Sequence, residues 1–116
     1  MSQLLEVTDV DGVTFVNFEI DKIYEPQVED INNTFKSLIE SGRRKIVIDF
    51  SGVTYCHRSF LDKLVIFHKS LDCVGGMVVL CCIYSDQINR KLRETQLDKF
   101  FTIDGTRDEA SALFQK

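Results

Sequence analysis

The residues of this sequence best suited to regulatory chemistry lie around Ser59, where an apolar helical repeat begins. Ser59 and Asp62 have the spacing of a helix-capping signal, and a serine cap stabilises a helix by about 1 kcal/mol. The same hydroxyl is a candidate phosphate acceptor, because free N–H groups and the helix dipole favour an anion at a helix N-terminus. A phosphoserine carries roughly −1.5 to −2 charges, so we expect it to repel a docked partner without unfolding the chain.

Several kinds of catalytic site find little support. The sequence has no GxGxxG, GxxxxGK[ST] or GxSxG motif, so neither a nucleotide-binding loop nor a nucleophile elbow is visible. Cys56 and His57 are adjacent, and adjacent side chains usually point in different directions. His68 lies on the apolar stripe of its helix, where packing is the commoner role. We therefore expect a chain without enzymatic activity and without a cofactor.

The four cysteines lie in or beside apolar segments and show no paired CxxC spacing. We expect them to be reduced and buried, and we expect no metal site. Two minority hypotheses stay open. One is a metal site built from Cys56, His57 and a distant cysteine. The other is a small redox or cofactor-binding protein that uses Cys56, which predicts a reactive thiol of low pKa.

Length and composition are those of an ordinary globular domain. The chain has 116 residues, of which 44% are hydrophobic and 28% charged, and its net charge is −4; residues 1–116 are expected to form one domain. The acidic balance gives no electrostatic footprint for nucleic acid. No apolar run approaches the roughly 20 residues that span a bilayer, so we expect no membrane insertion. Met1 to Asp11 lacks the features of a signal peptide, and we expect a cytoplasmic protein.

The elements that must position Ser59 follow from turn signals and periodicity. Strands and helices alternate after an initial hairpin, which predicts an α/β fold with a mostly parallel central β-sheet, an N-terminal β-hairpin and about four helices. The expected strands are Leu4 to Thr8, Val13 to Phe18, Lys45 to Asp49, Met77 to Ile83 and Phe100 to Ile103. The expected helices begin near Pro26, at Ser59, after the cap Ser85-Asp86 and after the capping box that starts at Thr106.

Two ordered motifs resemble a known family. Asp49-Phe50-Ser51, then Val53 and Tyr55, then the run from His57 to Leu61 is similar to the STAS pattern of a strand ending in Asp-Leu-Ser followed by Asp-Ser-Ser-Gly-Leu. Farther along, Gly75-Gly76 precedes an apolar strand and a Leu and Phe pattern that is also similar. The resemblance to the STAS domain, the anti-sigma factor antagonist family, covers nearly the whole chain.

This resemblance implies a bacterial regulatory module without catalysis of its own, acting in partner switching, signal transduction and transcription regulation. Its partners would be an anti-sigma factor that is often also a serine protein kinase, with a phosphatase as a further candidate. Ser59 aligns with the serine that the family phosphorylates. The alternative is a STAS scaffold without phosphorylation, within a multiprotein assembly such as a lipid-transport complex. The sequence leaves the oligomeric state open.

The residues around Ser59 depart from the family pattern. His57 replaces the acidic residue, Arg58 the first serine and Phe60 the glycine, which reverses the local charge. We predict that a partner surface is formed here by His57, Arg58, Phe60, Asp62 and Lys63. Phe60, Ile66 and Phe67 fall beside the main apolar stripe of the helix. We expect Phe60 to dock a partner, and Phe67 to be covered by the chain itself.

Overall fold

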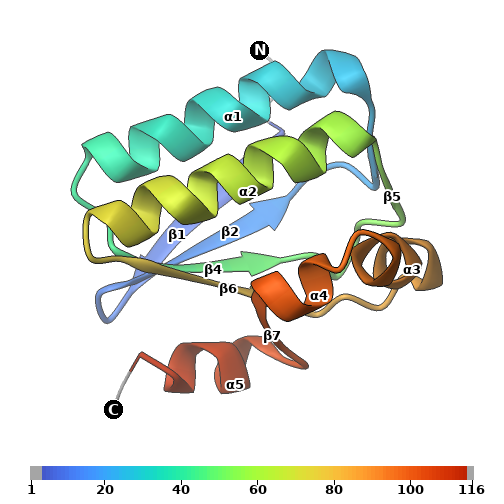
Figure 1. Ribbon diagram of the computed structural model, residues 1–116. Coiled ribbons are helices and arrows are strands. Elements are labelled where there is room, and N and C mark those ends of the chain that lie inside the picture. Colours follow the sequence, from blue (N-terminus) through green and yellow to red (C-terminus); the bar gives the residue numbers. More distant parts are fainter. Residues whose placement is uncertain (1–3, 115–116) are drawn as a thin grey trace.

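The computed structural model, which describes residues 4–114, is built on a five-stranded sheet with the order β1-β2-β4-β6-β7. The first two strands form an antiparallel hairpin, and each later pair in the sheet is parallel. The mostly parallel sheet and the N-terminal hairpin that the sequence predicts are therefore confirmed (Figure 1). The strands are β1 (Leu5–Val10), β2 (Val13–Phe18), β4 (Lys45–Asp49), β6 (Met77–Cys81) and β7 (Thr102–Asp104).

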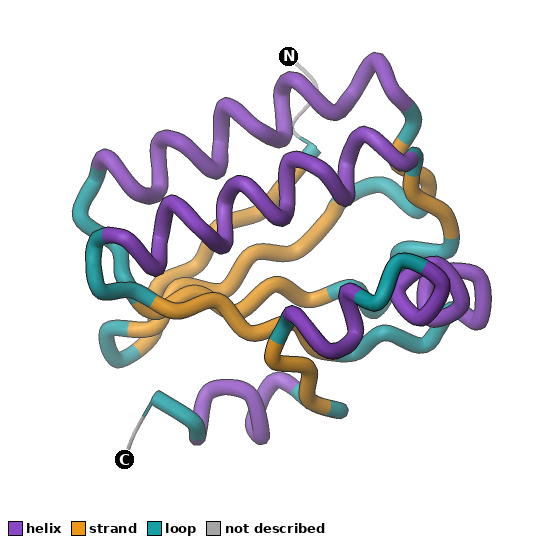
Figure 2. The backbone as a smooth tube through the Cα atoms, in the orientation of Figure 1, coloured by secondary structure: helices purple, strands orange, loops and turns teal. Residues whose placement is uncertain are grey.

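Two long helices, α1 (Glu25–Glu40) and α2 (Arg58–Cys73), cover one face of the sheet and lie side by side (Figure 2). Each buries residues at three- and four-residue steps, which is the spacing of one helix face. The rings of Phe35 and Phe67 stack between the two helices with centroids 4.3 Å apart. The main hydrophobic core lies between these helices and the sheet.

Within the described residues, the opposite face carries a single short helix, α5 (Arg107–Ala112). Ala110 packs there against Val47 and Val79, within a smaller cluster of buried residues. The remaining helices, α3 (Asp86–Glu94) and α4 (Leu97–Phe100), lie near the β7 edge of the sheet (Figure 1). No helix in the described part of the chain is both long and apolar enough to cross a membrane.

The structure adds elements that the sequence does not reveal. A two-stranded parallel pair joins β3 (Lys22–Ile23) to β5 (Tyr55–Cys56), and α4 raises the number of described helices to five. Two-residue strands and a four-residue helix are too short to show a hydrophobic period. The strand predicted over Met77 to Ile83 is β6, and its predicted end at Ile83 is wrong. The strand stops at Cys81, because Cys82 takes a left-handed backbone with a φ of 59°.

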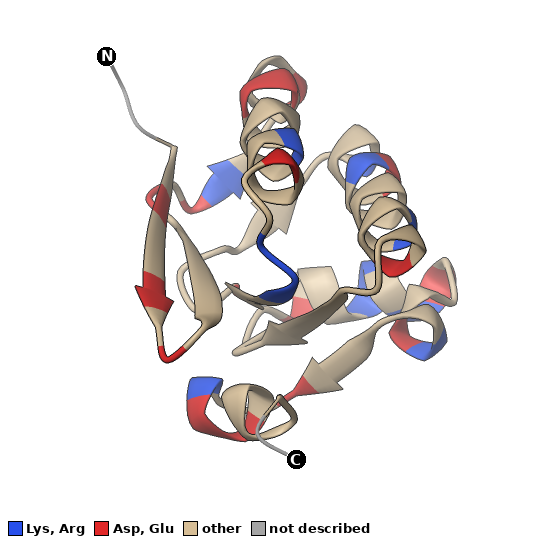
Figure 3. Cartoon of the chain, turned by 90° about the vertical axis from the view of Figure 1, so that its left-hand side faces the viewer, with Lys and Arg blue, Asp and Glu red and all other residues tan. Residues whose placement is uncertain are grey.

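The edge strand β7 begins at Thr102, two residues later than predicted, because α4 and its cap occupy the chain up to Phe101. Acidic and basic residues are intermingled along the helices and do not gather on one face of the molecule in this view (Figure 3). The side of the molecule drawn there therefore shows no surface of a single charge.

Candidate functional site

The short β3–β5 pair brings the starts of α1 and α2 together. Ile23 pairs with Cys56, and the N–H of His57 donates to the carbonyl of Ile23 over 2.7 Å. Each strand leads within two residues into its helix, so Glu25 and His57 face one another. His57 Nε2 lies 3.8 Å from Glu25 Oε2. Segments more than thirty residues apart in sequence thus meet at one end of the helical layer.

His57, not Ser59, caps α2. The N–H of Ser59 donates to His57 Nδ1 over 3.1 Å, and Ser59 Oγ lies 2.8 Å from the same nitrogen. The prediction that Ser59 is the N-cap is therefore wrong: the helix begins at Arg58, and Ser59 is its second residue. The reason is that the imidazole nitrogen supplies the acceptor that a serine oxygen usually provides at this position. Because Nδ1 accepts the amide N–H, the Ser59 hydroxyl is placed to donate to it.

Ser59 is half-buried and lies at one end of a groove between α1 and α2. This part of the groove has a volume of about 380 Å³, and Glu25, Glu29 and Lys63 also line it. The hydroxyl is therefore held by His57 without being sealed beneath the rest of the chain. Two cations, Lys36 and Lys63, and two carboxylates set the local field around it.

Of the five residues predicted to contact a partner, four reach the surface and one is buried. Arg58 and Asp62 are exposed, and His57 and Lys63 are half-buried. Phe60 is only 1% exposed, so the expectation that it anchors a partner at the surface is wrong.

Phe60 is buried because the third residue of α2 points into the core. Its ring meets Phe18 edge-on with centroids 5.7 Å apart, and it also lies close to Phe50. Phe67 is 3% exposed, which confirms that the chain itself covers it. Ile66 is the outward-facing apolar residue of this helix, at 51% exposure, and it lines the continuation of the groove between α1 and α2.

Residues that the sequence does not single out complete this end of the molecule. The rings of Tyr24 and Tyr55 lie 5.5 Å apart, and Tyr24 is half-exposed. The ammonium of Lys91 lies 4.4 Å from the centre of the Tyr55 ring and also donates to the carbonyl of Cys56. These contacts depend on the β3–β5 pair and on α3, so no spacing in the sequence predicts them.

Cys56 and His68 are packed inside the fold. Burial raises the pKa of the Cys56 thiol, and the nearby charge of Lys91 opposes this only in part. A raised pKa contradicts the hypothesis of a reactive, low-pKa thiol at Cys56. His68 is half-buried, with its ring edge-on to Phe100 and Phe101 at 4.7 Å and 5.4 Å, which matches its predicted packing role.

Comparison with known proteins places this architecture in a family. The family model of the STAS domain matches residues 5–110. A putative anti-sigma factor antagonist from Thermotoga maritima is similar over 97% of this chain and 95% of its own, with a TM-score of 0.84 and 23% identity. An anti-sigma factor antagonist from Mycobacterium paratuberculosis is similar over 97% of this chain and 93% of its own, with a TM-score of 0.82 and 24% identity.

A third similar structure is that of the Bacillus cell fate determinant SpoIIAA in its phosphorylated form. It has a TM-score of 0.73 and 16% identity, and the match covers 95% of this chain and 98% of that one. At these identities the solved structures support the fold, while the family match spans nearly all of the described residues. The chain belongs to the STAS domain family.

Proposed function

We propose that this chain is a non-catalytic, anti-sigma factor antagonist-like binding module. Phosphorylation of Ser59 would weaken its binding to the partner. The observation that carries the proposal is the position of the Ser59 hydroxyl. It lies in the first turn of α2 and lines an open groove, at the rim of the layer formed by the two long helices. The similar SpoIIAA structure in a phosphorylated form shows that a protein of this fold accepts a phosphate.

The local charges suit a switch that acts on binding rather than on folding. A phosphate on Ser59 would sit at a helix N-terminus, where backbone N–H groups and the helix dipole favour an anion. Arg58 follows the cap directly, and Lys63 lies one turn along the helix beside the same groove. Glu25 and Glu29 oppose these cations. The folded chain therefore tolerates the added charge, whereas a partner surface packed over Ser59 would have to desolvate it.

The partner surface that we propose consists of His57, Arg58, Asp62 and Lys63 around Ser59, extended by Tyr24. Exposed tyrosine and arginine are side chains that protein interfaces favour. The partner would be an anti-sigma factor with serine kinase activity, with a phosphatase restoring the free hydroxyl. The chain itself would contribute the acceptor serine and no catalytic group.

The test uses the chain purified from its native host and an anti-sigma factor kinase of the same organism. We expect intact-mass and peptide mass spectrometry to find one phosphate on Ser59 after incubation with the kinase and ATP, and none on Ser59→Ala. In a binding titration we expect Ser59→Asp to weaken the complex at least about tenfold, which corresponds to about 1.4 kcal/mol.

Ser70→Asp is the matched control, because Ser70 is an exposed serine on the same helix that lines the far part of the groove. It adds the same charge three turns from Ser59 and should leave the affinity within about twofold. Equal affinities for wild type and Ser59→Asp, with both variants folded, would rule out the switch. A chain that enters a stable complex and never carries phosphate would instead support the scaffold alternative.

A further inference from the structure

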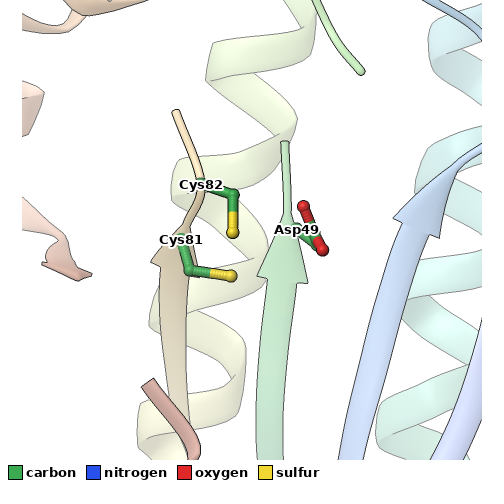
Figure 4. A group of neighbouring side chains, drawn as sticks. All are labelled: Asp49, Cys81 and Cys82. Atoms are coloured by element: carbon green, nitrogen blue, oxygen red, sulfur yellow. The ribbon is translucent and has the colours of Figure 1, made fainter. Parts of the chain in front are cut away.

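Three potential metal ligands converge on the face of the sheet opposite α1 and α2. Asp49 ends β4, Cys81 ends β6, and Cys82 follows it. One carboxylate oxygen and the two sulfur atoms all lie within 4.8 Å of one another. All three residues are buried, with exposures of 7%, 0% and 6%. Figure 4 shows both sulfur atoms on the side of β6 that faces Asp49.

The convergence depends on sheet register and on one unusual backbone conformation. Asp49 and Cys81 are register partners across the parallel β4–β6 pair, so their side chains share a face of the sheet. In a regular strand the next side chain would point to the opposite face. Cys82 has a φ of 59°, and both cysteines belong to the same buried cluster under α5. Left-handed backbone is uncommon for residues other than glycine, and such strain is concentrated at functional sites.

We propose that Asp49, Cys81 and Cys82 bind a thiophilic divalent cation, with Zn²⁺ as the cellular ligand. Two thiolates and one carboxylate are a ligand set that zinc accepts, with one coordination position left for water. Zinc–sulfur distances of about 2.3 Å and zinc–oxygen distances of about 2.0–2.2 Å require ligand atoms roughly 3.5–4 Å apart. The ligand atoms therefore need to move inward by no more than about 1 Å.

The charges balance around such a site. Binding converts both thiols to thiolates and releases about two protons to solvent, so Zn²⁺ with two thiolates and one carboxylate carries a net charge of −1. Arg107 lies beside it, with Nε 3.3 Å from Asp49 Oδ2, and its positive charge offsets that excess.

The site lies close to solvent despite its burial. Tyr84 follows two residues after Cys82 and is 67% exposed. Sheet edges at the carboxyl ends of parallel strands are where ligands usually bind in folds of this class. Asp49 and Cys82 also retain a little exposure, at 7% and 6%, so a cation can reach the site from the carboxyl ends of β4 and β6.

The experiment titrates the reduced, full chain with Zn²⁺ and Co²⁺ and records X-ray absorption at the zinc edge. We expect one tightly bound equivalent, a thiolate-to-cobalt charge-transfer band and about two sulfur ligands at about 2.3 Å. Cys82→Ser and Asp49→Asn should each weaken binding at least about tenfold, while Cys73→Ser, which removes an exposed thiol, should leave it unchanged.

The X-ray absorption of the wild-type chain keeps the proposal testable even where a variant fails to fold. A zinc spectrum without sulfur ligands would overturn the site. So would binding that survives in a folded Cys82→Ser variant or that disappears in Cys73→Ser, because the cation would then be held elsewhere. The proposal is independent of Ser59, since the cluster lies on the other face of the sheet.

Discussion

The two faces of the sheet differ in the helices that cover them and in the amount of hydrophobic core that they bury. On one face, two sixteen-residue helices enclose the main core, in which many large side chains are fully buried. On the other face, a six-residue helix covers a small cluster of valines, cysteines and one alanine. Neighbouring residues of one strand serve both faces: Ile46 and Ile48 belong to the main core, while Val47 belongs to the smaller cluster.

This difference suggests how stability and chemistry are divided. Apolar burial contributes roughly 25 cal/mol per Å², so most of the stabilising free energy comes from the face under α1 and α2. We call this face the stable face. The face under α5, which we call the thin face, instead holds Asp49 and the adjacent thiols of Cys81 and Cys82. Ser59 lies at the rim of the stable face, where the phosphorylation that we propose would alter binding while the core beneath it stays packed.

The largest expected effect tests the stable face directly. Phe60→Ala removes a ring that is 1% exposed and surrounded by other aromatic side chains. Replacing a buried phenylalanine by alanine typically costs about 3–5 kcal/mol. We expect urea denaturation to show a loss of that size in the free energy of unfolding.

Ile66→Ala is the matched control on the same helix. Ile66 is 51% exposed, so its truncation should change the free energy of unfolding by no more than about 0.5 kcal/mol. Comparable losses for the two variants would show that Phe60 does not lie in the core, and would return it to the partner surface that the sequence predicts.

The fate of Phe60 shows what the sequence predicts well and what it does not. The hairpin, both long helices and the buried strands follow from hydrophobic periodicity and from turn signals such as Asp11-Gly12. The sequence predicts that Phe60 falls beside the main apolar stripe of its helix, and a residue at that margin can face either the core or a partner. With His57 as the cap, the helix begins one residue earlier, and the third residue packs against strand and loop aromatics that only the tertiary structure brings near.

The candidate sites illustrate the same limit. The position of Ser59 near a helix start follows from local sequence, but its neighbour Glu25 comes from another helix through the β3–β5 pair. The Asp49 cluster needs a strand register and a left-handed residue at Cys82. The sequence shows no spacing pattern for this cluster. Its residues come from two strands about thirty positions apart, and they meet only because of one non-repeating backbone conformation.

A smaller effect is expected on the thin face. Asp49 is 7% exposed, accepts the N–H of Ser51 over 2.8 Å and forms an ion pair with Arg107. Arg107→Met keeps much of the side-chain volume but leaves this buried carboxylate without its cation. We expect a loss of about 1–3 kcal/mol in the free energy of unfolding, the usual cost of leaving a buried polar group unpaired.

The measurement is a urea titration in the presence of a chelator, so that a bound cation cannot compensate for the missing charge. Arg90→Met is the control, because Arg90 is an exposed arginine on α3, and its loss should fall within about 0.5 kcal/mol. If Arg107→Met behaves like this control, the ion pair does not hold the thin face together.

The smallest effect concerns a second aspartate–arginine pair, at the exposed rim of the other face. Arg43 donates to both carboxylate oxygens of Asp9, over 3.0 Å and 2.7 Å, and Thr14 donates to one of them. The Arg43 and Thr14 hydrogen bonds lower the pKa of Asp9 from 3.8 to about 2. Because the Asp9 side chain is half-exposed, solvent screens the pair, and we expect Arg43→Gln to cost less than about 1 kcal/mol at neutral pH.

The pH dependence of this small cost has a definite sign. A lowered pKa in the folded state means that Asp9 stabilises the fold when ionised. This contribution is present above pH 3.8 and is lost as the pH falls towards about 2. The difference between wild type and Arg43→Gln should therefore shrink over that window in urea titrations, and also shrink with added salt at neutral pH. A difference that stays constant down to pH 2 would show that Arg43 acts through packing of its stem rather than through Asp9.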